Sequence, residues 1–436
     1  MSAQIGEEFR AAGVAQVIVI LDTAKAGGAA AGVVSAKGDL QRMRRHFVTA
    51  ETSQDTALAI EHAAASGAGQ RRLVAMGRVG PAAARSSVVT PPEPMRVFPN
   101  LGIVFGTVSR EGLAALRSEP SVEQVVGAPR IGLIRPKKIA AATPRRKLAW
   151  GLEALGTPKL WKQGLTGKNV IVAHLDTGAD GKHAALKRAI AAFAAFDDFG
   201  FEISPAPAAF DSADHGTHTA ATIAGRTVKN FTMGMAPGAK LASAVVIEGG
   251  NAPARVLAGM DWAVGQGARV INMSLGFRGY REDFLPLTKL LRDRGILPVF
   301  AVGNEGPGTS RSPGNYPESL SVGAVARDDI VADFSSSQRF KRRKEPIVPD
   351  LLGPGVDVIS AKPGGGFQAM DGTSMATPHI SGLAALLFEA KPDATPDQVE
   401  AAIFGSCLRG ANVPAERGNR GMPEASRALA ILTGSA

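Results

Sequence analysis

The sequence predicts an α/β protein in which a larger domain, built on a parallel sheet, follows a smaller α+β domain. In the second half of the chain, apolar strands alternate with helical windows, which is typical of a parallel sheet covered on both faces. The first part has a shorter mixed pattern and ends in a basic, proline-containing stretch at residues 135–150. These two observations set the expected fold class.

Length and composition indicate a globular protein. The chain has 436 residues, enough for two or three domains, with 45% hydrophobic and 20% charged residues, which excludes a mostly disordered chain. We see no apolar run of about 18 residues, so no membrane partner is expected. A single cysteine, Cys407, excludes an intramolecular disulfide framework. The start MSAQIGEEFR has no signal-peptide pattern, which favours a cytoplasmic location, with export by another route left open.

The positive charge is unevenly placed. The formal net charge is +10, and residues 1–146 carry 19 Lys and Arg against 11 Asp and Glu. Part of this excess lies between Arg130 and Lys147. A solvated basic linker explains it, and an acidic partner is the alternative. Because no recognition motif accompanies the charge, no nucleic-acid partner is predicted.

Four elements are expected in the first part. Residues 14–22 and 122–127 have the composition of strands, and residues 96–108 form another, with Pro99 marking a break or an edge. Residues 109–120 predict a short helix, capped by Ser109 and stopped by Pro120. Together they make a small α+β domain.

The second half repeats strand and helix. Its buried-type strands are expected at residues 168–176, 239–247, 268–276, 296–303 and 320–326. Helical windows lie between or after them, at residues 253–267, 283–295 and 373–390. Active sites of such sheets lie outside the carboxyl ends of the strands, where Asp176, Ser274 and Asn304 fall.

Three segments supply the residues for nucleophilic catalysis. They are AHLDTG (173–178), DHGTHTA (214–220) and DGTSMATPH (371–379). A serine hydroxyl needs an imidazole to take its proton and a buried carboxylate to orient that imidazole. We therefore expect Ser374 to be the nucleophile, His215 the general base and Asp176 its orienter. The structural alternative is a helix-capping serine with a core histidine.

A fourth segment can stabilise the oxyanion of acyl transfer. FAVGNEG (300–306) ends a strand with Asn304 in a glycine-flanked turn. The Asn304 side-chain amide and the Ser374 backbone N–H, at a helix start, would be the donors. The alternative is an ordinary turn asparagine.

These segments resemble those of the subtilisin-like serine peptidases, the subtilase family. The similarity runs from residues 150–178 to 418–429 and includes GMAPGAKL (234–241) and VINMSLG (270–276). The order Asp, His, Ser also agrees with that family. The resemblance implies a three-layer parallel-sheet catalytic domain and a serine endopeptidase that cuts protein or peptide substrates through an acyl-enzyme on Ser374.

The resemblance also implies a substrate cleft. Ser274, Leu275 and Gly276 look like the segment whose backbone pairs with an extended substrate. Ala301, Val302 and Gly303 look like the opposite wall of the primary specificity pocket, with Glu305 near its rim. The preferred side chain is left open.

Residues 96–127 resemble the second half of the inhibitor-type propeptide that precedes many subtilases, with 17–21 as its first strand and a long insertion at about 25–90. This implies a propeptide-like domain at 1–136, a linker with the processing site at 137–149 and a catalytic domain at 150–436. The N-terminal domain would act as an intramolecular inhibitor of a zymogen, with autoprocessing within about 134–149. A stable, uncleaved interaction module is the alternative.

No metal site is predicted. Many subtilases hold calcium in a loop that corresponds to residues 226–234, but Val228 and Lys229 stand there where oxygen ligands would be expected. Residues 196–200 (FDDFG) could bind calcium, although paired aspartates are usually just solvated. The HGTH motif has no third ligand cluster, so zinc is rejected, and His218, His183 and His379 are expected to be structural.

Two other functional classes compete with the peptidase. One is an inactive subtilase fold used for binding, against which the intact motifs argue. The other is a lipase-type esterase, which requires G-x-S-x-G around the serine, whereas residues 372–376 are GTSMA. The first would not label with a fluorophosphonate, and the second would not hydrolyse a peptide amide.

Overall fold

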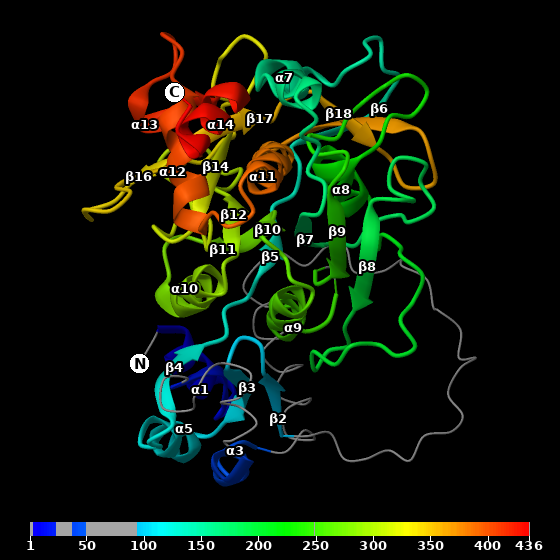
Figure 1. The fold of residues 1–436 in the computed structure, drawn as a ribbon. Coiled ribbons are helices and arrows are strands. Elements are labelled where there is room, and N and C mark those ends of the chain that lie inside the picture. Colours follow the sequence, from blue (N-terminus) through cyan, green and yellow to red (C-terminus); the bar gives the residue numbers. More distant parts are fainter. Residues whose placement is uncertain (1–2, 23–36, 49–93, 248, 436) are drawn as a thin grey trace. The chain divides into compact units, whose positions relative to one another are not determined.

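The computed structural model describes residues 3–22, 37–48, 94–247 and 249–435 (Figure 1). It divides into two units, Met1–Ala128 and Pro129–Ala436. The expected division lay after residue 136. Residues 129–136 belong instead to the second unit, because β5 (Gly132–Leu133) pairs there with β11 (Leu275–Arg278). Most of the expected insertion at 25–90 lies outside the described residues.

The first unit is a four-stranded antiparallel sheet with helices. The strand order is β2-β3-β1-β4, and β1 pairs with both β3 and β4. Its elements are α1 (Ala3–Ala12), β1 (Ala15–Leu21), α3 (Lys37–Arg44), β2 (Met95–Phe98), β3 (Ile103–Val108), α5 (Arg110–Arg117) and β4 (Val122–Gly127). The single strand expected at 96–108 is therefore a hairpin with its turn beginning at Pro99, where proline removes a ladder donor. Ser109 caps α5 as expected, accepting from the Gly112 N–H.

The second unit contains a seven-stranded sheet in the order β17-β14-β12-β10-β7-β9-β8. Every neighbouring pair is parallel, which confirms the predicted fold class. The strands are β7 (Ile171–Asp176), β8 (Ile190–Ala195), β9 (Lys240–Val245), β10 (Val270–Met273), β12 (Leu297–Ala301), β14 (Leu320–Val325) and β17 (Leu351–Pro354).

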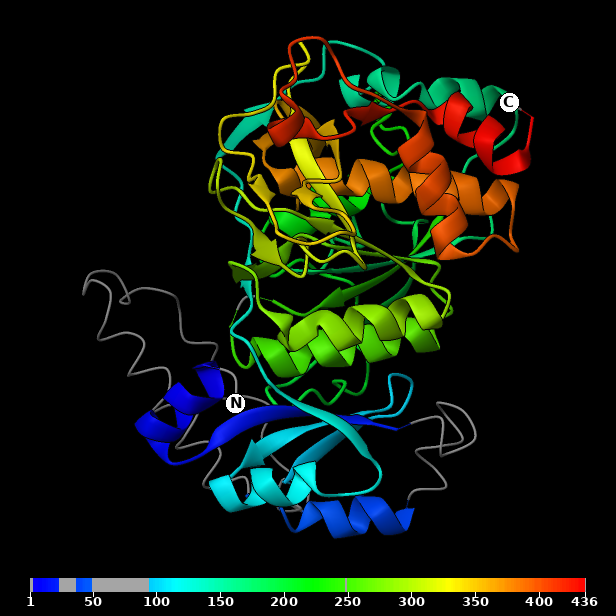
Figure 2. The ribbon, with the colours of Figure 1, turned by 90° about the vertical axis from the view of Figure 1, so that its left-hand side faces the viewer.

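Helices cover both faces of this sheet. Figure 2 shows α9 and α10 on one face and α11 on the other. α11 contacts β10, β12, β14 and β17, and α8 packs against α11. The main helices are α8 (His215–Ala224), α9 (Ala252–Gly265), α10 (Leu285–Asp293), α11 (Thr373–Ala390), α12 (Pro396–Ser406) and α14 (Ala425–Thr433). The short ones are α6 (Trp150–Ala154), α7 (Thr157–Lys162), η1 (Glu282–Phe284) and α13 (Ala415–Gly418).

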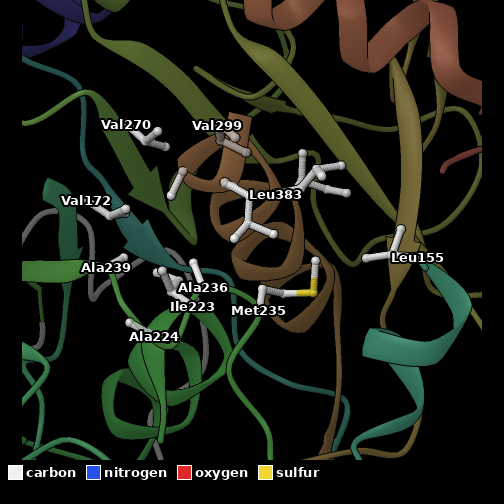
Figure 3. Close-up of a cluster of buried hydrophobic side chains, with 14 of the residues drawn as sticks. Leu155, Val172, Ile223, Ala224, Met235, Ala236, Ala239, Val270, Val299 and Leu383 are labelled. Atoms are coloured by element: carbon white, nitrogen blue, oxygen red, sulfur yellow. The ribbon is translucent and has the colours of Figure 1, made fainter. Parts of the chain in front are cut away.

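The core of the second unit lies between the sheet and α11. Figure 3 shows Val172, Val270 and Val299, from three adjacent strands, beside Leu383 of α11. All four side chains are fully buried. A buried valine or leucine contributes about 1.5–3 kcal/mol through its transfer from water. This packing holds α11 against that face of the sheet.

Small antiparallel sheets surround those strand ends. One has the order β13-β11-β5 and another β18-β19-β6. Their strands, with two further pairs elsewhere, are β6 (Lys138–Ala142), β13 (Arg311–Ser312), β18 (Val358–Ala361), β19 (Phe367–Asp371), β15 (Gln338–Arg339), β16 (Ile347–Val348), β20 (Cys407–Leu408) and β21 (Met422–Pro423). β6 lies in the stretch expected to be an irregular linker.

A search of the helices in the described ranges found none with the length and hydrophobicity that crossing a bilayer requires.

Candidate active site

Asp176 and His215 form a buried pair. Asp176 ends β7, and His215 is the first residue of α8. His215 Nδ1 donates to Asp176 Oδ1 at 2.7 Å, and the Thr177 N–H donates to the same oxygen at 2.7 Å. The helix start approaches β7 closely, since a Cβ on Gly216 would lie 1.9 Å from the Gly178 oxygen. The glycines of both motifs therefore permit the contact.

The pair is electrostatically matched. Burial by itself would raise the pKa of Asp176, but the charge and hydrogen bond of His215 hold that pKa below its ordinary value. Burial would likewise lower the pKa of His215, and Asp176 reverses this and raises it. The carboxylate thus stabilises the imidazolium form, which makes His215 a better proton acceptor.

A second histidine lies behind Asp176. His174 Nε2 lies 2.8 Å from Thr219 Oγ1 and 3.8 Å from Asp176 Oδ2, and His174 Nδ1 lies 3.0 Å from Ser243 Oγ. Burial lowers the pKa of His174 to about 4, so its ring is neutral at pH 7. Sequence reasoning missed it. The signal was a polar residue within an apolar strand, two positions before Asp176 and so on the same strand face.

Ser374 is the second residue of α11, where the backbone leaves β19 through Gly372. Its Oγ–H donates to the Ile134 oxygen at 2.7 Å. His215 Nε2 is buried and has no hydrogen-bond partner within the described residues. The expected hydroxyl-to-imidazole hydrogen bond is therefore not made here, because the single hydroxyl proton is directed to the Ile134 carbonyl.

Asn304 is held with its amide toward the same segment. Its Oδ1 accepts from the Thr373 N–H at 2.9 Å and from Thr373 Oγ1 at 2.9 Å. Its Nδ2 donates to the Arg135 oxygen at 2.9 Å. The hydrogen bonds to Thr373 fix which end of the amide is the donor. Asn304 and Ser374 thus reach the backbone of two consecutive residues.

The segment 129–142 crosses the site as an extended chain. On one side, β5 pairs with β11, with Leu133 opposite Leu275, and the Ile134 N–H donates to the Ser274 oxygen at 3.0 Å. On the other side, β6 pairs with β19, the strand that leads into Ser374. The residues 274–276 that were predicted to bind substrate by strand addition therefore pair with a segment of this chain.

The opposite predicted wall lies at the end of β12. The Val302 oxygen accepts from the Arg311 N–H at 2.9 Å, and the Gly303 oxygen accepts from Thr373 Oγ1 at 3.3 Å. Ala301, at the end of β12, is likewise buried. Arg311, which sequence reasoning missed, places its guanidinium against Glu305. This pairing carried no sequence signal, because six positions separate the two residues across a loop.

The three histidines expected to be structural each bind a backbone oxygen. Nitrogens of His218, His183 and His379 donate to the backbone oxygens of Val358, Gly366 and Met375. Burial lowers the pKa of His218 to about 3 and that of His379 to about 4.

The two aspartates of the loop at residues 196–200 have protein partners. The Asp198 carboxylate pairs with Arg255 at 2.8 Å, and Asp197 Oδ1 accepts two backbone N–H groups. Lys229 places an ammonium in the other loop. No group of three or more His, Cys, Asp or Glu side chains in the described residues could hold a metal.

Comparison of the sequence with known proteins identifies a family. The subtilase family model matches residues 167–423. Subtilisin E of Bacillus subtilis is 33% identical over 293 residues, which cover 66% of this chain and 72% of its own length. M-protease of Shouchella clausii is 30% identical over 302 residues, covering 69% of this chain and 72% of its own.

A solved structure agrees with these relatives. Fervidolysin from Fervidobacterium pennivorans, described as a keratinolytic enzyme related to subtilisin, aligns with a TM-score of 0.61 at 27% identity. The alignment covers 76% of this chain but only 56% of fervidolysin. With a parallel sheet of the expected topology and matches over most of its second unit, the chain belongs to the subtilase family and is a serine endopeptidase.

Proposed function

We propose that this enzyme cuts peptide bonds with Ser374 as nucleophile, His215 as general base, Asp176 as the group that orients His215, and Asn304 as an oxyanion donor. One observation carries the assignment. Ser374 Oγ and Asn304 Nδ2 donate to successive carbonyls of one extended segment, those of Ile134 and Arg135, so both side chains face the same stretch of chain.

The chemistry follows from these positions. Ser374 Oγ attacks the carbonyl carbon and its proton passes to His215 Nε2, which has no hydrogen-bond partner among the residues that the structure describes. The Asn304 amide and the Ser374 backbone N–H stabilise the resulting oxyanion. When the carbon–nitrogen bond breaks, His215 gives its proton to the leaving amine and Ser374 holds the acyl group. Water, deprotonated by His215, then releases the acid and restores the serine.

We further propose that the chain is made as a self-inhibited zymogen, with the first unit as the inhibitor domain and residues 129–142 as the inhibitory segment. Paired with β11 and β19, this segment takes the edges that a substrate would need. The Ser374 proton is also bound to Ile134 rather than to His215. Both contacts support a resting state.

The same contacts suggest the processing bond. The Ile134 N–H donates to the Ser274 oxygen and Ser374 Oγ–H donates to the Ile134 oxygen, whereas Asn304 Nδ2 donates to the next carbonyl, that of Arg135. Because the Ile134 carbonyl is the one beside Ser374, we propose that the Ile134–Arg135 bond is cut. Self-processing there would give a catalytic chain that begins at Arg135.

Intact mass and N-terminal sequencing of the purified chain, beside Ser374→Ala, test both proposals. We expect cleavage after Ile134 in the unsubstituted chain and none in the variant. A new terminus elsewhere would refute the proposed bond, and an uncleaved but active chain would refute the zymogen. Labelling with a fluorophosphonate at a residue other than Ser374 would refute the catalytic assignment.

A further inference from the structure

Arg311 lies between the two walls predicted to form the primary specificity pocket, the pocket for the side chain that precedes the cut bond. β13 pairs with β11, where Arg278 is opposite Arg311. The Arg311 N–H also donates to Val302 on the opposite wall at 2.9 Å. Its backbone is therefore anchored to both walls.

The Arg311 side chain connects the same walls. Its Nη1 donates to the Gly276 oxygen at 3.3 Å, and its Nε donates to Glu305 Oε1 at 3.0 Å. Glu305 is in turn held by the Asn304 N–H, which donates to Oε2 at 3.1 Å. The Arg311 and Glu305 side chains are only 13% and 19% exposed. The ion pair is a fixed part of the pocket rather than a solvated surface contact.

The ion pair packs directly on the wall. A Cβ added to Gly303 would lie 2.8 Å from Glu305 Oε2 and 3.2 Å from Arg311 Cγ. Little unfilled space therefore remains between Gly303 and the two charged side chains. A long side chain entering between the walls would have to displace Arg311 and break its hydrogen bonds.

The local charge also matters. Glu305 faces two guanidinium groups, since Arg278 Nε lies 3.9 Å from its Oε1. Burial would raise the pKa of Glu305, but the hydrogen bond and charge of Arg311 keep it below its ordinary value, so the carboxylate is ionised. Arg278 is exposed and screened by water, whereas the half-buried Glu305 carboxylate is already paired with Arg311, so it offers no free counter-charge to a lysine or arginine entering between the walls.

We propose that Arg311 determines the specificity of this peptidase, by restricting the residue before the cut bond to short aliphatic side chains and excluding aromatic and basic ones. This rests on the proposed function, because it takes Ser374 as the nucleophile. Ile134, a buried aliphatic residue directly before the Ile134–Arg135 bond, has the required size.

The test is the ratio of kcat/KM values for peptide p-nitroanilides that differ only in the last residue, with alanine, valine, phenylalanine or lysine in that place. Active sites are titrated with a fluorophosphonate. We expect alanine and valine to exceed phenylalanine and lysine by at least about tenfold. Phenylalanine or lysine at or above alanine would overturn the proposal without any variant.

Two variants and a control sharpen the test. Arg311→Gly should raise the ratio for phenylalanine over alanine by about tenfold or more, because it opens the space between the walls. The double variant Arg311→Gly with Glu305→Gln removes both charges and should act in the same direction even if the unpaired carboxylate destabilises the single variant. Arg278→Gly removes a guanidinium near the same carboxylate, but its side chain is 78% exposed, so the ratio should stay unchanged.

The outcomes separate the two proposals. If a folded, titratable enzyme hydrolyses the alanine peptide and neither Arg311 variant changes the ratio, the specificity proposal is wrong and the catalytic one stands. If the processed protein cuts none of the four peptides and does not react with the fluorophosphonate, the proposed function itself fails.

Discussion

The two sides of the site are built differently. Asp176 and His215 are fixed by groups of the second unit's own core: β7, the start of α8, and a second buried imidazole at His174. Ser374 and Asn304 instead direct their free donors to the segment 129–142. The contrast teaches that the proposed acid–base pair is built into the fold, whereas the hydrogen bonding of the proposed nucleophile depends on the segment that crosses the site.

Removing the nucleophile should have the largest effect. For Ser374→Ala we expect kcat/KM to fall by about a million-fold, a magnitude known for subtilisin. Near-normal turnover by the variant would contradict the assignment.

Breaking the buried Asp176–His215 pair should lower activity less than removing Ser374 does. In Asp176→Asn the His215 ring loses its charged partner and its fixed tautomer, and we expect kcat to fall by about 10⁴. The kcat of His215→Ala should fall further, because this change removes the base itself.

The pH dependence of kcat/KM gives a second test of the Asp176–His215 pair. Asp176 raises the pKa of His215, so kcat/KM of the native enzyme is lost as pH falls through that raised value, and the acid limb of the variant should shift to lower pH. If Asp176→Asn were the weaker enzyme, the roles would be reversed.

The next largest loss of activity is expected for Asn304, the proposed oxyanion donor. Asn304→Ala should lower kcat by about 10²–10³ with little change in KM, the scale seen for this donor in subtilisin. Rate measurements at saturating peptide separate the two constants. A loss seen only in KM would assign Asn304 to substrate binding instead.

The smallest effect on activity is expected at His174. His174→Val should lower kcat/KM by less than about tenfold, because the ring reaches Asp176 only through Thr219 or at 3.8 Å. Its effect on stability should be clearer. Burial lowers the pKa of His174 from the ordinary 6.5 to about 4, so the unfolded chain binds a proton more readily than the folded one between these values.

The native protein should therefore lose stability as pH falls from about 6.5 towards 4, at up to about 1.4 kcal/mol per pH unit for this one group. Because His174→Val lacks this group, its free energy of unfolding should fall by a correspondingly smaller amount over the same pH range. Urea unfolding at pH 7 and pH 5 measures the difference. An unchanged pH dependence would show that the ring contributes nothing to acid sensitivity.

The positions of the proposed catalytic side chains in the fold were predictable because each stands in a local motif at a point that the topology fixes. Asp176 ends a strand and Ser374 begins a helix, and parallel strands bring such ends to one edge of the sheet. Period and motif together were enough to place them without coordinates.

The remaining features depend on contacts distant in sequence. β6 is alanine-rich and has no alternating pattern of its own, so only its partner β19, more than 220 positions later, makes it a strand. The Arg311–Glu305 pair and the ring behind Asp176 depend in the same way on how loops and strands meet. The secondary-structure propensity of a local segment does not predict pairings between residues distant in sequence.

The pairing of β6 with β19 would outlast a cut at Ile134–Arg135. Five residue pairs would still hold β6 on β19, so the new amino terminus would stay within a few residues of this paired strand and close to Ser374. A tethered amine at such high effective concentration can attack the acyl group and reseal the chain. Dissociation of β6 from β19, rather than the bond cleavage itself, would then make maturation irreversible.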